Sequence, residues 1–175
     1  MSPRALILVL LAIPVVAQIP RAPDLEAQRA AMKKLDFLVG KWSGEAHVQR
    51  GAGEPDALIQ TEEAQYKLDG LILVIEGVGR NKSDGKTTLR AYGIVSYDDA
   101  AGTYHMRAFN DGRFLETDVK LLEQGKGFAW GFGVGQIKTS SVMRISEAGE
   151  WTELTEITLG AQAPRKYMDV RVSKQ

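Results

Sequence analysis

From Lys41 to the C-terminus, apolar and polar side chains alternate along most of the chain, and this pattern constrains the fold more than any other feature. In residues 41–49, Trp42, Ala46 and Val48 share one face, while charged and polar side chains share the other. A period of two is typical of a β-strand with one buried face. No segment between the predicted strands is long enough for a crossover helix, so neighbouring strands are expected to pair antiparallel.

Turn residues divide this region into about ten strands. Asp69-Gly70 is a strong hairpin signal, and Asn110-Asp111-Gly112 marks a later turn. The predicted strands are 41–49, 58–68, 71–80, 87–97, 103–109, 113–122, 128–134, 137–145, 151–159 and 166–172. A meander of this length has two unpaired edges unless it closes on itself, and closure removes both. The sequence therefore predicts an all-β fold, a single closed antiparallel meander β-barrel.

A short helix is predicted just before the first strand. Asp24 is a suitable N-cap, the composition of residues 25–38 favours a helix, and Gly40 stands where a C-cap glycine is expected. Apolar residues recur near helical spacing within this segment. We expect the helix to close one end of the barrel; the alternative is a frayed helix on the surface.

The first residues have the features of a secretory signal peptide. Arg4 precedes an apolar run from Ala5 to Val16, and small residues favour cleavage after Ala17. The run is shorter than the roughly 20 residues of a transmembrane span. The predicted segments are a signal peptide at 1–17, a flexible spacer at 18–23 and the barrel domain at 24–175. This organisation predicts a secreted or periplasmic protein; the alternative is an uncleaved N-terminal anchor.

The composition argues against several partners and chemistries. Lys plus Arg and Asp plus Glu both number 22, so the chain lacks the basic excess with which proteins neutralise nucleic-acid phosphates. The chain has no cysteine, which removes disulfides, thiolate metal sites and a lipidated cysteine after the signal. We expect a soluble protein with no stable membrane anchor after cleavage, held together by its core alone.

Three segments carry a resemblance to known proteins: LDFLVGKWSGE at 35–45, TEEAQYKLDGLILVIEG at 61–77 and AYGIVSYDDAAGTYHMRAF at 91–109. The G-x-W at Gly40–Trp42, placed where a helix meets the first strand, resembles the lipocalin and wider calycin signature. Together the segments are similar to a family of secreted bacterial calycin-like proteins of unknown function. The resemblance implies a calycin-like barrel in which Gly40 and Trp42 are structural.

The resemblance also bears on Trp42 and on cofactors. In calycins the family tryptophan packs at the closed end, usually against a basic side chain near the last strand, which implies Arg165 or Arg171 for that role. Nitrobindin, a more distant likeness, binds haem through a barrel histidine. His47 and His105 both fall on predicted outer faces, where solvated histidines are the usual case, so no cofactor and no metal are expected.

The seventh predicted strand places three aromatic side chains, Phe128, Trp130 and Phe132, on the inner face. Inward aromatic rings are suited to line a cavity for an apolar ligand. The alternative is that they fill the core, because small barrels fill their interiors with side chains.

Two carboxylates, Glu62 and Glu76, also fall on inner faces in the predicted alternation. A carboxylate inside a barrel is costly unless it is paired or hydrated, so such a group is suited to hold a polar ligand head. Arg90 and Tyr92 are placed to reach them. The alternatives are a solvated lumen or a structural ion pair, and a face shifted by one residue would turn these side chains outward. The predicted ligand-binding residues are Glu62, Tyr66, Glu76, Arg90, Tyr92, Phe128, Trp130 and Phe132.

No catalytic motif is found: the chain lacks a G-x-S-x-G elbow, an H-E-x-x-H pair, a P-loop and a dinucleotide fingerprint. The sequence therefore predicts an extracytoplasmic binding protein that holds a small apolar or amphipathic molecule in the barrel without catalysis. One alternative is a structural or protein-interaction module with a filled barrel. A further alternative is an enzyme that uses Glu62 or Glu76 as a general base.

Overall fold

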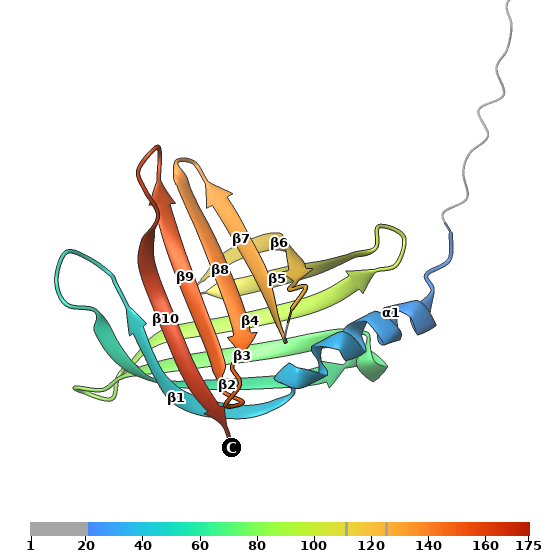
Figure 1. Cartoon of the computed structure of the whole chain (residues 1–175), viewed down its shortest axis with the longest axis horizontal. Helices are drawn as coiled ribbons and strands as arrows, with labels where there is room; N and C mark the ends of the chain where they lie inside the picture. Colours follow the sequence, from blue (N-terminus) through green and yellow to red (C-terminus); the bar gives the residue numbers. More distant parts are fainter. Residues whose placement is uncertain (1–20, 111, 125) are drawn as a thin grey trace, which may run out of the picture.

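The computed structural model describes residues 21–110, 112–124 and 126–175, so the predicted signal peptide lies outside the described residues (Figure 1). Its helical segments are α1 (Leu25–Met32), η1 (Lys33–Leu38) and η2 (Leu68–Gly70). Its strands are β1 (Gly40–Val48), β2 (Asp56–Lys67), β3 (Ile72–Asn81), β4 (Thr87–Asp98), β5 (Thr103–Asn110), β6 (Arg113–Leu121), β7 (Gly127–Val134), β8 (Ile137–Ile145), β9 (Trp151–Leu159) and β10 (Arg165–Lys174). Within the described residues, none of the helices has the length and apolar character needed to cross a membrane.

The ten strands form one closed antiparallel barrel, which confirms the predicted fold class. Each strand pairs with its neighbour in sequence, and β1 closes the barrel by pairing with β10. Figure 1 shows β7 to β10 running steeply across the flatter strands β2 to β6. Where the two groups meet, the paired positions of β6 and β7 are Lys120 with Ala129 and Leu121 with Phe128. The barrel wall is therefore least continuous between β6 and β7.

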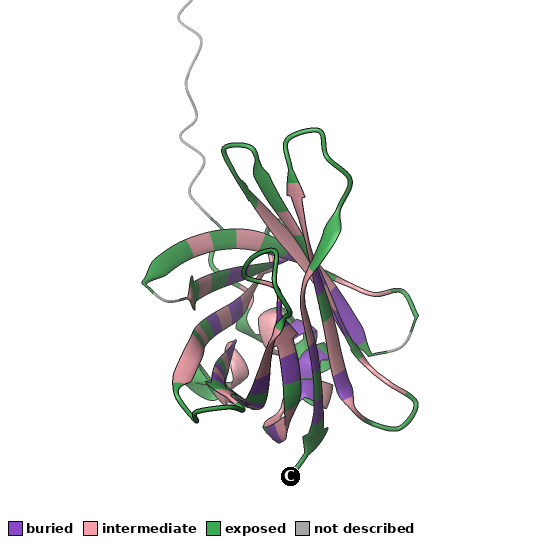
Figure 2. Ribbon diagram, turned by 90° about the vertical axis from the view of Figure 1, so that its left-hand side faces the viewer, coloured by how far each residue is buried: buried purple, intermediate pink, exposed green. Residues whose placement is uncertain are grey.

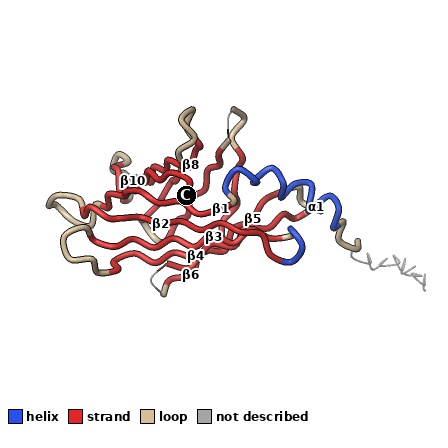
Figure 3. The backbone as a smooth tube through the Cα atoms, turned by 90° about the horizontal axis from the view of Figure 1, so that it is seen from below, coloured by secondary structure: helices blue, strands red, loops and turns tan. Residues whose placement is uncertain are grey.

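The helical segments α1 and η1 cover one end of the barrel, as expected (Figure 3). Two tyrosines that point inward hold them there: the Tyr104 hydroxyl donates to the Ala31 carbonyl at 2.7 Å, and the Tyr66 hydroxyl donates to the Met32 carbonyl at 2.6 Å. The N-cap Asp24 accepts a hydrogen bond from the Ala27 amide, as predicted. This end of the barrel is therefore closed by protein.

The predicted continuous helix changes type at Met32, where α1 gives way to the 3₁₀ segment η1. Met32, Leu35 and Leu38 are three residues apart and fully buried. A 3₁₀ helix has three residues per turn, so this spacing places all three side chains on one face, whereas an α-helix would spread them. The tighter helix is the form that buries all three against the barrel.

Trp42 lies at the closed end and is buried, as predicted. Its indole N–H donates to the Leu38 carbonyl at 2.8 Å, and its ring meets Trp151 edge-on at 5.8 Å. The basic partner is Lys174, whose ammonium lies 5.4 Å from the centre of the Trp42 ring. The implied choice of Arg165 or Arg171 is therefore wrong.

The β1–β10 register explains this correction. Lys174 is the residue directly opposite Trp42, whereas Arg171 is opposite Glu45. An odd separation along a strand turns a side chain to the other face, and Arg171 accordingly bonds Glu150 at 3.4 Å on the exposed side. Arg165 pairs with β9 at the far end of β10, away from Trp42.

Candidate functional site

The aromatic residues of β7 form one wall of the lumen, and we call Phe128, Trp130 and Phe132 the aromatic wall. Phe128 is buried and lies opposite the buried Met143 of β8, which places this face inside the barrel as predicted. Its ring centre is 5.1 Å from that of Trp130. Trp130 and Phe132 are only half-buried, so the wall becomes more accessible with distance from the closed end.

The accessible end of the lumen is its mouth, opposite the helices. Val134, Ile137 and Leu159 are in phase with the buried residues of their strands, yet their exposed fractions are 69%, 41% and 43%. The hairpins that bear them are exposed and project away from the barrel (Figure 2). Apolar side chains therefore lead from the surface to the aromatic wall.

Polar side chains from three strands lie deeper in the lumen. We call Gln60 and Glu62 of β2, Ser141 of β8, and Glu153 and Thr155 of β9 the lumen polar cluster. The Gln60 amide donates to Glu62 Oε1 at 2.7 Å, the Ser141 and Thr155 hydroxyls are 2.8 Å apart, and the Thr155 hydroxyl donates to Glu153 Oε1 at 3.4 Å. Ser141 is directly opposite Trp130, so the cluster adjoins the aromatic wall.

The two carboxyl groups of the cluster have raised pKa values. Burial raises the pKa of Glu62 to about 8, and the charge of Glu153 adds to the increase, while the Gln60 amide acts against it. Burial also raises the pKa of Glu153 to about 7, against hydrogen bonding from Thr155. The Trp151 N–H lies close enough to lower the pKa of Glu153 in the same way, but no hydrogen bond joins the two groups. Near neutral pH both carboxyls are thus poised between the neutral and charged forms.

Two glycines of β3 provide room for the polar side chains of β2. A Cβ atom at Gly77 would lie 2.8 Å from Glu62 Oε2, and one at Gly79 would lie 2.8 Å from both Gln60 Oε1 and Leu58 Cδ1. These glycines are directly opposite Glu62 and Gln60 in the β2–β3 register. The space that the cluster occupies is therefore made by missing side chains on the neighbouring strand.

Replacing Gly79 with alanine is expected to lower the free energy of unfolding by about 2 kcal/mol, because the new methyl overpacks the buried Leu58 and Gln60. Gly93→Ala is the matched control, since its Cβ would meet nothing closer than Met106 Sδ at 3.8 Å. Urea unfolding measures both variants. Equal stability of the two variants would contradict the packing described for Gly79.

The structure corrects the predicted faces of β3 and β4. Glu76 is exposed and lies opposite Glu63 and Tyr92, because the inward residue at this level of β3 is Gly77. Arg90 and Tyr92 are likewise exposed on the outer face of β4. The prediction that these three residues line the lumen is therefore wrong. In both strands, the residues that face inward are the neighbours of the predicted ones.

The remaining predicted residues do face inward, but they do not form one group. Glu62 belongs to the lumen polar cluster, and the aromatic wall adjoins it. Tyr66 is at the closed end, where its hydroxyl lies 2.6 Å from the Met32 carbonyl and 2.8 Å from Asp36 Oδ1. Tyr66 therefore anchors the helices and has no hydroxyl hydrogen left for a ligand.

Four members of the cluster were not predicted: Gln60, Ser141, Glu153 and Thr155. A signal for them does exist in β9, where Glu153 and Thr155 alternate in phase with the buried Trp151. A charged residue in phase with buried apolar residues indicates an internal carboxyl group. That Glu153 lies near Glu62 follows from the closed barrel and not from any local pattern.

Both histidines lie on the outer faces, as predicted. His47 Nδ1 is 3.1 Å from Asp169 Oδ1, and His105 Nδ1 is 2.8 Å from Asp118 Oδ1. Among the described residues, no group of three or more His, Asp or Glu side chains is arranged to hold a metal ion.

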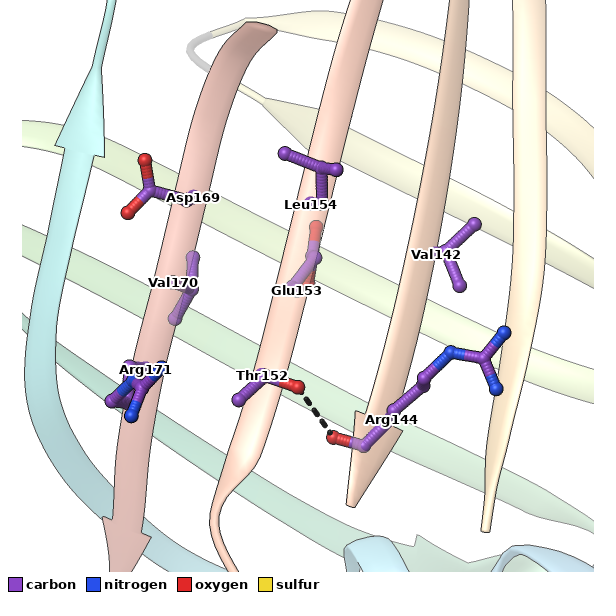
Figure 4. A pocket seen from close by; sticks show the side chains of 8 residues that line it. All are labelled: Val142, Arg144, Thr152, Glu153, Leu154, Asp169, Val170 and Arg171. Carbon is purple, nitrogen blue, oxygen red and sulfur yellow. Dashed lines mark hydrogen bonds between the residues drawn. The ribbon is translucent and has the colours of Figure 1, made fainter. Parts of the chain in front are cut away.

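Among the depressions that the described residues form, two lie on the outside of the barrel. One of them has a volume of about 280 Å³ and runs along the outer side of β8, β9 and β10. Figure 4 shows Arg144, Thr152 and Leu154 on the side of these strands that faces the viewer, with Glu153 behind the β9 ribbon. The other, of about 440 Å³, follows the outer faces of β1 to β3. Residues of the first are Val142, Arg144, Thr152, Glu153, Leu154, Asp169, Val170 and Arg171. Neither depression includes a residue of the aromatic wall.

These features define a closed ten-strand antiparallel barrel of the calycin-like kind, with one end capped and polar groups in its lumen. The chain is similar to a solved structure, the crystal structure of Rv2717c from M. tuberculosis, with a TM-score of 0.67 and 14% sequence identity, over 83% of this chain and 97% of that one. At this identity the likeness shows the fold alone. No protein-family model and no curated protein matches the sequence.

Proposed function

We propose that this protein is an extracytoplasmic binding protein that holds a small apolar or amphipathic molecule in the barrel lumen without catalysing a reaction. The observation that carries the proposal is the aromatic wall, whose Trp130 and Phe132 face inward yet are only half-buried near the mouth. A filled core would bury both rings, because exposed aromatic surface is unfavourable. An apolar ligand would cover them.

A titration with a fluorescent fatty acid or a hydrophobic dye tests this proposal. The signal is expected to saturate, and Trp130→Ala is expected to weaken binding about tenfold, because a large apolar contact is lost. Phe114→Ala is the control, since Phe114 is an aromatic residue on the outer face of β6, 57% exposed and away from the lumen. Absence of saturation, or an equal loss in both variants, would overturn the proposal.

A second candidate function is a protein-interaction module, favoured by one feature of the outer surface. Tyr92, Phe109 and Phe114 are side by side across β4 to β6, with exposed fractions of 40%, 45% and 57%. Exposed aromatic residues grouped in this way are typical of interaction surfaces. This candidate function predicts that Phe114→Ala weakens binding to a partner protein, whereas Trp130→Ala leaves that binding unchanged.

The location outside the cytoplasm is supported by the apolar run that follows Arg4. We expect the exported protein to begin at Gln18, and intact-mass spectrometry of the protein recovered from its own compartment measures this. Recovery of a chain that retains residues 1–17 in the membrane fraction would favour the uncleaved anchor instead.

A further inference from the structure

The lumen polar cluster contains two acids and no base. Neither carboxyl has a basic side chain among the groups that shift its pKa. The strands beside β2 are β1 and β3, and those beside β9 are β8 and β10. Within the described residues, the inner faces of β1, β3 and β8 carry no charged side chain. Elsewhere in the described strands, the ionisable groups in inward phase are Tyr66, Tyr97 and Tyr104 at the closed end, Lys174 of β10 beside Trp42, and Arg113 and Arg165 towards the mouth.

Two buried polar atoms beside these acids lack a hydrogen-bond partner in the described part of the chain: Gln60 Oε1 and Trp151 Nε1. Their side chains are 2% and 3% exposed. The Gln60 amide nitrogen is committed to Glu62, so the amide oxygen of Gln60 is the free acceptor next to that carboxyl. A buried acceptor without a donor is energetically unfavourable, because it has lost its hydrogen bonds to water. A ligand group that donates hydrogen bonds would therefore be stabilised beside Gln60 Oε1 and Glu62.

We propose that the lumen polar cluster binds the primary ammonium group of an amphiphilic amine, whose apolar part lies along the aromatic wall towards the mouth. This inference rests on the proposed function and specifies its ligand class. A primary ammonium has three N–H donors, and Glu62, Glu153 and Gln60 Oε1 supply three acceptors. Its charge also compensates the two carboxylates inside the barrel, and charge-assisted hydrogen bonds of this kind are the strong ones.

Ammonium binding is linked to proton release. Below pH 7 both carboxyls are mainly protonated, since burial raises the pKa of Glu62 to about 8 and that of Glu153 to about 7. A bound cation favours the carboxylate form, so each binding event displaces protons that a neutral ligand would leave in place. The affinity for an amine is therefore expected to rise about tenfold per pH unit between pH 5.5 and 7 for one proton released.

Calorimetric titration of the purified protein with octylamine, 1-octanol and octanoate tests the inference, because the three probes share one apolar chain and differ in the head group. At pH 7.5 we expect octylamine to bind at least thirtyfold more tightly than either of the others. Glu62→Gln and Glu153→Gln are each expected to remove most of that preference. The matched control is Glu76→Gln, which changes an exposed carboxylate on the adjacent strand and is expected to leave it intact.

The outcomes separate the two proposals. If the three probes bind alike and Trp130→Ala weakens all of them, the ammonium site is wrong and the apolar lumen stands. If octylamine binds with no pH dependence, or equally well to Glu62→Gln, the ammonium site is also wrong. If none of the three binds, the ammonium site fails, and the dye titration decides on the lumen. Thermal unfolding of each variant shows that it is folded under the conditions of the titration.

Discussion

Replacing Trp42 with alanine is expected to lower the free energy of unfolding by about 4 kcal/mol, which is typical when a buried tryptophan is truncated to alanine. The Trp42 side chain is 3% exposed, packs edge-on against Trp151, and donates its indole hydrogen to the Leu38 carbonyl. The substitution leaves a cavity between η1 and β1 and a carbonyl without its donor. Urea unfolding followed by far-ultraviolet circular dichroism measures the loss.

Trp130→Ala is the matched comparison for this variant, because it removes the same side chain from the half-buried aromatic wall. We expect it to cost about 1–2 kcal/mol, since less apolar surface returns to water. Equal losses in the two variants would show that Trp42 does not hold the helical cap to the barrel. If Trp42→Ala is less stable but still binds the hydrophobic dye, Trp42 has a structural role and Trp130 has the proposed binding role.

The stability of the protein is expected to fall as pH rises from about 5 to 8. Glu62 has a pKa raised from 4.5 to about 8 in the folded protein, so between these values the unfolded chain gives up a proton that the folded chain retains. A raised carboxyl pKa therefore leaves the protein most stable at low pH and less stable as the pH approaches 8. The shift corresponds to at most ~5 kcal/mol. Because Glu62 is only half-buried, solvent screening reduces this to about 3 kcal/mol.

Glu62→Gln should remove the part of this pH dependence that Glu62 contributes, because glutamine keeps the shape and carries no ionisable proton. The raised pKa of Glu153 leaves a smaller fall in stability up to about pH 7. Relative to the wild type, the variant should gain about 3 kcal/mol between pH 5 and pH 8, as measured by urea unfolding at each pH. Glu76→Gln should follow the wild type at every pH, because Glu76 is exposed. A Glu62→Gln curve parallel to the wild type would mean that Glu62 ionises as freely as a surface carboxyl.

Local patterns predicted those parts of the site that alternate clearly. In β7 the aromatic residues alternate with alanine and glycine, so the face of Phe128, Trp130 and Phe132 follows from period two alone. In β3 the run ILVIEGVGR is apolar on both faces near its start, and no local rule distinguishes the inner from the outer phase. The pairing of Glu62 with Gly77 settles that phase, which explains why Glu76 was misplaced.

The sequence by itself determined that the chain forms an antiparallel meander, that a helix precedes it, and that Trp42 is buried, because these follow from neighbours along the chain. Only the tertiary structure decided which groups meet across the lumen. Closure through β1 and β10 leaves only these two strands between β2 and β9, so that the charge of Glu153 acts on Glu62. Contacts of this kind depend on the register of every strand between the two residues, and the amino-acid pattern of any single strand does not contain them.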